Sequence, residues 1–268
     1  MTWVYSIPVW LVCFLFIGGT SAFAVGGLLI ARSPRMAKLR APSNDFAGPV
    51  MATLGTILAV MLSFMVVTVW QQYDESAQLV QTESDQISNL YHEVSVFPQP
   101  LRDQTHAAIE RYVDIVVDQE WPLMRQGSES PTAHRAAVHV VTLIENFNPK
   151  TLGEQNAQAD ALHHAHAFMD ARGSRLFENQ ESVPPLLWVV MLFIAVVTLG
   201  SAYFFHVDDI RAHLFMTAAV GAVIGAIFVV IAELDLPFRG ELQIPPSAFS
   251  HDYKTFLDDP VPTPKPSP

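Results

Sequence analysis

Cysteine is almost absent from this sequence, since Cys13 is the only one among 268 residues. A single thiol excludes a disulfide framework within the chain and any metal site built from several cysteines. Common catalytic patterns are missing too: the sequence holds no glycine-rich phosphate loop, no nucleophile elbow and no zinc-protease helix. We therefore expect no enzymatic activity, no cofactor and no metal ion.

Basic residues are scarce as well, and the charge is localised. The chain carries 15 Lys and Arg against 26 Asp and Glu, a net charge of −11. Residues 71–185 contain 17 acidic and 7 basic side chains, so nearly all of the excess lies there. An acidic domain repels nucleic acid, and we expect no nucleic-acid partner.

Charged residues are absent from four long apolar stretches, Val9–Ile30, Ala47–Trp70, Leu186–His206 and Ala212–Ala232. A helix of roughly 20 apolar residues crosses a hydrocarbon core, where lipid offers exposed backbone amides no partner. We predict an all-α protein that crosses the lipid bilayer four times, with a helical bundle inserted between two pairs of transmembrane helices.

Four parts follow from this layout. Residues 1–70 form the first transmembrane pair, 71–185 the extramembrane acidic helical domain, 186–235 the second pair and 236–268 an extramembrane tail. The alternating prolines of Pro260–Pro268 predict a disordered end.

Orientation is predicted from Lys and Arg near the spans. Arg32, Arg35, Lys38 and Arg40 lie between the first two spans, and Arg211 lies between the last two. Because short cytoplasmic loops are enriched in Lys and Arg, we predict that these two loops lie inside. The large domain and both termini are then on the outer side.

The second span continues into the polar region. From Ala52 to Val94, small or apolar residues recur at alternating spacings of four and three, the coiled-coil period, and neither Pro nor Gly interrupts Thr56–Phe97. The pattern predicts one helix of about 50 residues, roughly 75 Å long, that ends at Pro98 and Pro100. Its predicted packing seam is small and polar within the lipid and more apolar outside it.

Three further helices complete the predicted bundle. They cover Leu101–Gln126, Thr132–Phe147 and residues 151–184. Ser130 is a predicted N-cap for the second of them, and Thr151 opens a predicted capping box on the third.

Small residues recur every fourth position on the outer spans, at Gly221 and Gly225 on the fourth and at Gly18, Ala22 and Gly26 on the first. In lipid, helices associate through close backbone approach. We predict close helix contacts on both spans at these positions.

Three motifs together resemble a known family: Ser43–Thr56 at the second span, Asp118–Pro122 in the polar domain and Leu234–Gly240 after the fourth span. They are similar to motifs of the bacterial bestrophin-like family of unknown function, over about residues 10–250. The resemblance implies a four-span protein of the bacterial inner membrane with a helical insert. Bestrophins themselves are pentameric anion channels whose second span lines the pore and whose large domain is cytoplasmic. No position here matches a bestrophin neck or calcium-binding motif.

The residues that carry the resemblance are Asn44, Asp45, Gly48, Pro49, Glu120, Trp121, Asp235, Pro237, Phe238 and Gly240.

The polar stripe of the second span is the strongest candidate for a functional surface. It comprises Ala52, Thr56, Ala59 and Ser63, and a candidate constriction beside it comprises Met61 and Phe64. If several copies met along this stripe, its small side chains would leave room for water and its hydroxyl groups would coordinate ions weakly. The alternative is that the hydroxyl groups bond their own helix or a neighbouring one.

Other polar residues have competing interpretations. Asp45 either caps the second span or attracts cations, and Arg239 is expected to pair with Asp235 after the fourth span. His163, His164 and His166, with Asp160 and Asp170, form the only metal-like cluster. We favour solvated histidines, and a response to pH is the alternative if the domain is periplasmic.

Two functions remain open. The first is a homo-oligomeric ion channel with the second span at its centre; the acidic domain favours cations, whereas the resemblance implies anions. The second is a non-conducting membrane sensor or scaffold whose helical domain binds a partner, supported by the unbroken helical path from domain to lipid.

Overall fold

The computed structural model describes residues 5, 7–33, 44–205 and 207–249. Within them the protein is helical, without strands, and four helices are long and apolar enough to cross a membrane. The predicted all-α, four-span architecture is confirmed. Two expectations lie outside the described residues: the disordered end at Pro260–Pro268 and the placement of Arg35, Lys38 and Arg40.

The helices are α1 (Val9–Cys13), a π-helical turn (Phe14–Gly18), α2 (Gly19–Ala31), α3 (Asn44–Glu93), a 3₁₀ turn (Val94–Val96), α4 (Leu101–Ile115), a second π-helical turn (Val116–Glu120), α5 (Trp121–Met124), α6 (Pro131–Glu145), α7 (Leu152–Glu178), α8 (Pro185–Ala202) and α9 (Ile210–Leu234).

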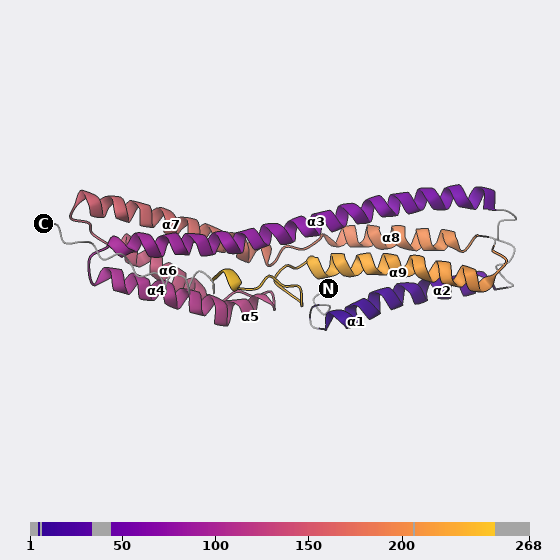
Figure 1. Cartoon of the computed structure of the whole chain (residues 1–268), viewed down its shortest axis with the longest axis horizontal. Coiled ribbons are helices and arrows are strands. Elements are labelled where there is room, and N and C mark those ends of the chain that lie inside the picture. The colour runs from indigo at the N-terminus through magenta and orange to yellow at the C-terminus, as the bar shows by residue number, and fades with distance from the viewer. Residues whose placement is uncertain (1–4, 6, 34–43, 206, 250–268) are drawn as a thin grey trace. The chain divides into compact units, whose positions relative to one another are not determined.

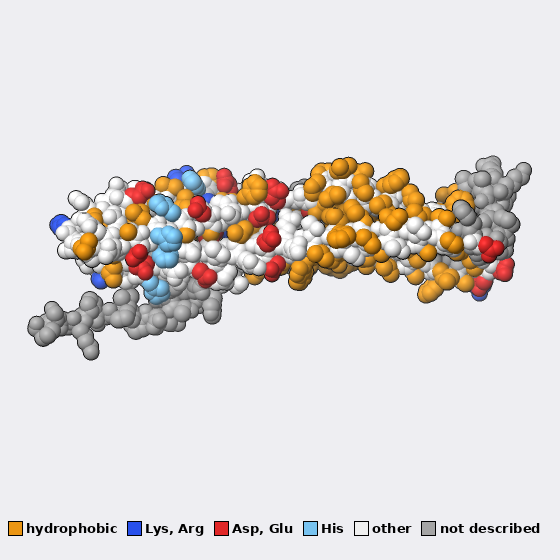
Figure 2. All heavy atoms as spheres, turned by 90° about the horizontal axis from the view of Figure 1, so that it is seen from above, with side chains coloured by type: hydrophobic (Ala, Val, Ile, Leu, Met, Phe, Trp, Pro, Cys, Tyr) orange, Lys and Arg blue, Asp and Glu red, His pale blue; other side chains and the backbone are white. Residues whose placement is uncertain are grey.

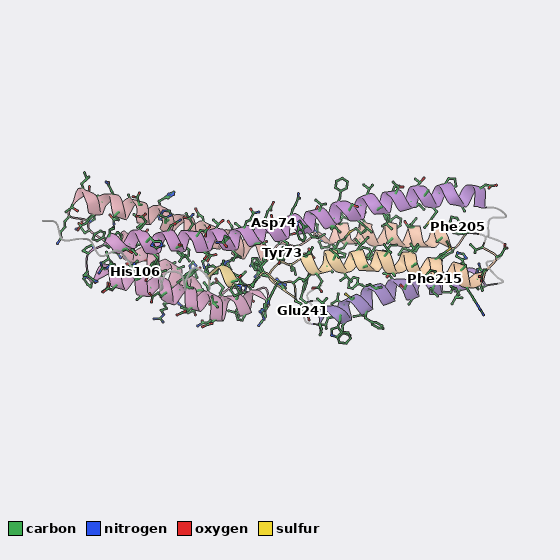
Figure 3. All side chains as sticks on the ribbon, viewed as in Figure 1. Tyr73, Asp74, His106, Phe205, Phe215 and Glu241 are labelled. Atoms are coloured by element: carbon green, nitrogen blue, oxygen red, sulfur yellow. The ribbon has the colours of Figure 1, made fainter. Side chains whose placement is uncertain are left out.

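The chain divides into two compact units. Unit 1 comprises Met1–Tyr73 and Ser182–Leu242, and unit 2 comprises Asp74–Glu181 and Gln243–Pro268. The boundary falls on α3 between Tyr73 and Asp74, both labelled in Figure 3. Figure 2 shows hydrophobic side chains covering much of the span region of unit 1, and acidic and histidine side chains on unit 2.

Unit 1 packs α3, α8 and α9 around one apolar core, and α2 lies against α9 (Figure 1). The core includes Leu58, Leu62, Met65 and Val69 of α3, Trp188, Met191 and Ala195 of α8, and Ile224, Phe228 and Ile231 of α9. Within lipid this core is held by dispersion and shape rather than by exclusion of water.

Two glycines bring α9 close to the first span, as predicted. A Cβ at Gly225 would lie 2.7 Å from the Phe16 carbonyl oxygen, and one at Gly221 would lie 2.9 Å from that of Thr20. The Thr20 hydroxyl donates to the carbonyl of Gly221 at 2.7 Å across this contact. Close backbone approach therefore joins these helices.

The matching prediction for the first span is wrong for its glycines. Nothing lies within 4 Å of a Cβ placed at Gly18 or Gly26. The first span instead meets α9 through Thr20, Ser21 and Ala24, because those residues occupy the face that α9 covers.

Unit 2 is a bundle of α4, α6 and α7 with the C-terminal part of α3 (Figure 1). Its buried residues include Ile87 and Leu90 of α3, Ile109 and Tyr112 of α4, Val140 and Ile144 of α6, and Ala165 and Phe168 of α7. The predicted caps are confirmed. The Ser130 hydroxyl accepts from the Ala133 amide at 3.2 Å, and Thr151 and Glu154 form the reciprocal capping box.

The single long helix is also confirmed, because α3 runs for 50 residues without a break. Outside the spans its predicted seam is buried at Val80, Ser84, Ile87 and Val94. Inside the span the predicted seam is wrong. Residues Leu58, Leu62, Met65 and Val69 face the core instead, where their large apolar side chains fill the space between α3, α8 and α9.

Replacing Gly225 with alanine tests the close contact between α9 and the first span. We expect Gly225→Ala to lower the free energy of unfolding by about 1–3 kcal/mol, because the added methyl group meets the Phe16 carbonyl. Gly200→Ala is the matched control, since nothing lies within 4 Å of its Cβ. Thermal unfolding in detergent measures both, and equal effects would contradict the contact.

Candidate functional site

The span part of α3 has two different faces. One carries the buried core residues Leu58, Leu62, Met65 and Val69. The other carries the predicted stripe, and Ala52, Thr56, Ala59 and Ser63 are all exposed. Because successive helical residues turn by about 100°, these four residues share one side of the helix, roughly 120° from the centre of the buried face. The chain's own helices therefore leave the stripe uncovered.

The hydroxyl groups on this helix bond their own backbone. Thr56 Oγ1 donates to the Ala52 carbonyl at 2.8 Å, and Thr53 Oγ1 donates to the Pro49 carbonyl at 2.9 Å. The hydroxyl proton of Thr56 is thus committed to the helix. Its oxygen lone pairs still point outward as acceptors for water or a cation.

The structure does not bring the two predicted constriction residues together. Phe64 is 68% exposed, whereas Met61 is half-buried and packs against the core of unit 1. By helical geometry Phe64 lies about 100° from the stripe and Met61 farther still. Within one chain they do not narrow the stripe.

The first motif forms the beginning of α3. The helix starts at Asn44, Asp45 lies exposed in its first turn, and Pro49 lies within the helix. Asp45 is therefore inside the helix and is not its N-cap. In the first turn its negative charge interacts favourably with the positive end of the helix dipole. Nothing lies within 4 Å of a Cβ at Gly48, and the side chain of Asn44 is outside the described residues.

The third motif forms a tight turn after α9. Asp235 Oδ1 accepts the Val183 amide at 2.6 Å, and the Arg239 amide donates to the Leu236 carbonyl at 3.0 Å. Gly240 has a φ of 74°, a conformation that favours glycine, and a Cβ there would lie 3.2 Å from the Tyr5 ring.

Pro237 and Phe238 occupy the middle of this turn, and Phe238 is buried. Asp235 Oδ1 is directed at the Val183 backbone, and the positive charge of Arg239 acts on Asp235. The expected ion pair between Asp235 and Arg239 stays a prediction.

The second motif belongs to a buried ion network in unit 2. Arg175 Nε donates to Glu83 Oε2 at 2.6 Å, and its Nη2 donates to Glu120 Oε2 at 2.9 Å. Arg172 pairs with the other oxygen of Glu120. The Tyr112 hydroxyl donates to Glu83 Oε1 at 2.6 Å.

These charges are removed from water. Glu83, Glu120 and Arg175 have 0% exposure. The Arg175 guanidinium also lies 5.0 Å from the centre of the Trp121 ring, a cation–π distance. Trp121 Nε1 donates to the Ile244 carbonyl at 3.0 Å, and Phe249 packs edge-on against the Trp121 ring.

Protonation is fixed by this arrangement. Burial alone would lower the pKa of Arg175, but the charge and hydrogen bonds of Glu83 raise that pKa well above the usual value. Burial, and after it the charge of Glu83, raises the pKa of Tyr112. Arg175 therefore stays charged and Tyr112 stays neutral across the physiological range.

The matched family model is the bestrophin-like domain, over residues 18–249. The chain belongs to the bestrophin-like family. A crystal structure of a bacterial bestrophin homologue from Klebsiella pneumoniae has a similar fold, with a TM-score of 0.64 and 14% identity over 94% of this chain and 98% of the homologue.

Two further crystal structures agree with this fold. A variant of a Klebsiella pneumoniae bestrophin homologue gives a TM-score of 0.65 at 15% identity, over 94% of this chain and 99% of that one. A variant of a membrane protein also gives 0.65 at 15% identity, over 89% and 96%. No match was found among curated proteins.

The ion network is what sequence reasoning missed in this bestrophin-like chain. From the sequence, Glu120 is named only for the family resemblance and Glu83 is not singled out, yet both side chains are fully buried. A signal existed, because Glu83 lies three residues after the seam residue Val80. Arg172 and Arg175 also lie three apart on α7, between the buried residues Ala171 and Leu176.

The histidines of α7 do not form a metal site among the described residues. His164 Nδ1 instead lies 2.8 Å from Gln86 Oε1, and the rings of His163 and His164 meet edge to face. Their response to pH stays a prediction.

Arg175 provides a direct test of the buried network. We expect Arg175→Met to lower the free energy of unfolding by about 3–5 kcal/mol, because it leaves two buried carboxylates without their main partner. Thermal unfolding followed by circular dichroism measures this loss. Arg111→Met on the exposed side of α4 is the control, and losses of similar size in both variants would rule the network out as a stabilising element.

His106 on α4, labelled in Figure 3, predicts a pH dependence of unit 2. Burial lowers its pKa, and the hydrogen bond to the Tyr91 carbonyl offsets only part of this effect. The folded state therefore favours the neutral ring. This contribution is complete above about pH 6.5 and is lost as the pH falls through the lowered pKa.

The wild-type melting temperature is expected to fall more than that of His106→Gln between about pH 7.5 and pH 5. His139→Gln, at an exposed position of α6, should behave like the wild type. Parallel pH profiles for the wild type and His106→Gln would show that burial of this ring has no such effect.

Proposed function

We propose that the protein is a subunit of an oligomeric ion channel in which the exposed stripe of α3 lines a shared pathway. The proposal is supported by membership of the bestrophin-like family, whose characterised members are oligomeric ion channels. It is supported further by the stripe itself, which the chain's other helices leave uncovered although Ala52, Thr56, Ala59 and Ser63 are small or polar. This exposed stripe is the observation that carries the proposal.

The chemistry of the stripe suits a water-filled pathway better than lipid. Small side chains leave space between neighbouring subunits, and hydroxyl oxygens replace part of the hydration shell of an ion. A lipid-facing helix gains nothing from such residues. The same α3 places Ile57 and Phe64 on another exposed side, where large apolar residues suit lipid or a neighbouring subunit.

Two opposing influences act on the charge preference of the pathway. Residues 71–185 carry a net charge of −10 and attract cations by long-range electrostatics, whereas the family resemblance implies anions.

The counts of Lys and Arg in the short loops support a large domain and both termini on the outer side of a bacterial inner membrane.

Ion flux from liposomes tests the pathway. With separate K⁺ and Cl⁻ gradients across the membrane, we expect the wild type to conduct and Thr56→Leu or Ser63→Leu to reduce flux about tenfold or more, because leucine fills the pathway with hydrocarbon. Which gradient decays gives the charge preference.

Thr68→Leu is the matched control for this experiment. Thr68 is an exposed hydroxyl residue of the same helix, and its Oγ1 donates to the Phe64 carbonyl at 2.9 Å, but it lies on a different side from the stripe. It should conduct like the wild type. Equal flux through Ser63→Leu and Thr68→Leu, or no flux through the wild type at any pH and voltage, would show that α3 does not line a conducting pathway.

A non-conducting sensor or scaffold is the second candidate, supported by the unbroken α3 helix shared by both units. In this function the helical bundle of unit 2 binds a partner and α3 transmits the effect to the spans. Oligomeric state in detergent separates the two candidates, since a strict monomer has no partner helix with which to line a central pathway.

A further inference from the structure

A groove of about 490 Å³ lies on unit 1 between α1, α3 and α9. Val9, Val66, Val67 and Val230 contribute apolar walls, and Trp70 and Gln71 line it toward the end of the span. Its volume falls in the range of roughly 300–1,000 Å³ that is usual for sites that bind small molecules. The walls are suited to a hydrocarbon chain.

Glu233 is the only charged residue that lines this groove within the described part of the chain. It is 3% exposed, and its Oε2 is buried without a hydrogen-bond partner. Desolvating a carboxylate is costly unless a donor or a cation compensates. Within the described residues this oxygen has no hydrogen-bond partner and lies beside Gly240, so Glu233 brings an incompletely satisfied carboxylate to the wall of the groove.

The surroundings of Glu233 favour a cation. Glu233 lies in the last turn of α9, where the negative end of the helix dipole adds to its charge. Glu241, labelled in Figure 3, adds a second negative charge close enough to act on Glu233.

The other polar groups nearby are engaged elsewhere. Asp235 accepts the Val183 amide, and the Tyr5 hydroxyl donates to the Ala232 carbonyl at 2.7 Å. The positive charge of Arg239 acts on Asp235 and on Tyr5. Glu233 is thus left as the recognition group of the groove.

We propose that this groove binds one phospholipid with a primary ammonium headgroup, of the phosphatidylethanolamine class. The ammonium group donates to Glu233, and an acyl chain lies along the valine walls. The Gln71 side-chain amide, which lines the same groove, offers donors to the phosphate.

The depth of the site in the membrane supports a lipid as the occupant. Glu233 and Trp70 lie near the ends of their apolar stretches, the level at which headgroups and interfacial tryptophans are found. A lipid supplies both the cation that Glu233 lacks and the hydrocarbon that the walls accept. A small hydrophilic amine supplies only the first.

Quenching of Trp70 fluorescence tests the proposal on the full chain in detergent. Trp70 is 60% exposed and lines the groove, so a brominated acyl chain bound there quenches its emission. The part of the signal that disappears in Trp70→Phe reports this site alone. Brominated phosphatidylethanolamine and phosphatidylcholine are titrated separately, because they share a net charge but only the first carries ammonium protons.

We expect phosphatidylethanolamine to quench Trp70 at about tenfold lower mole fraction than phosphatidylcholine, the effect of one charge-assisted hydrogen bond. Glu233→Gln should abolish this preference, and Glu241→Gln should keep most of it. Equal quenching by the two lipids in the wild type, or a preference that survives in Glu233→Gln, would overturn the proposal.

Val230→Phe gives an independent test that leaves Glu233 in place. The larger side chain fills the groove, so quenching of Trp70 by either lipid should weaken. Unchanged quenching would place the lipid outside the groove. Quenching by brominated dodecylammonium as strong as that by brominated phosphatidylethanolamine would show that a simple amphipathic amine, and not a phospholipid, is the occupant.

Discussion

One unbroken helix is the constraint on which both units depend. Helix α3 contributes to the core of unit 1 and to the ion network of unit 2. Its 50 residues form one continuous helix, with no break after which the direction of the side chains could change. Every residue on it therefore has its side fixed by helical geometry. Leu58, Leu62, Met65 and Val69 face the core of unit 1, and Glu83 faces the network of unit 2. The stripe of Ala52, Thr56, Ala59 and Ser63 remains uncovered.

The two units are held together by different forces, because their surroundings differ. In unit 1 lipid supplies no hydrophobic drive, so Gly221 and Gly225 permit close backbone approach and Thr20 adds a hydrogen bond between helices. In unit 2 water drives apolar burial, and the charges of Arg175 and Glu83 lie inside the bundle only because each has several partners.

The four spans and the long helix were predictable from the sequence because their signals are local. Runs without charge identify the spans, and the caps at Ser130 and Thr151 require only a few neighbouring residues. The inward face of α3 within the span was not predictable, since in an apolar run the residue pattern does not say which side meets other helices. Small residues suggested a seam there, yet Leu62 and Met65 form it.

The candidate site was predictable only in part. The stripe on α3 came from its spacing, and the structure adds that the stripe is exposed. The pairing of Glu83 with Arg175 joins residues 92 positions apart, and Glu233 gains its meaning from a groove built by three helices. Both depend on which helices pack together and in which register, and a single sequence determines neither.

The most direct test of the central claim is the water accessibility of the α3 stripe in liposomes. Cys13 is the only cysteine, so a Cys13→Ser background allows one new thiol at a time. A membrane-impermeant, water-soluble thiol reagent should modify Ala59→Cys and Ser63→Cys and change the ion flux, while Ile57→Cys, which is exposed on another side of the helix, stays unmodified. If the stripe positions react no faster than Ile57→Cys, they face lipid or packed protein, and α3 does not line an aqueous pathway.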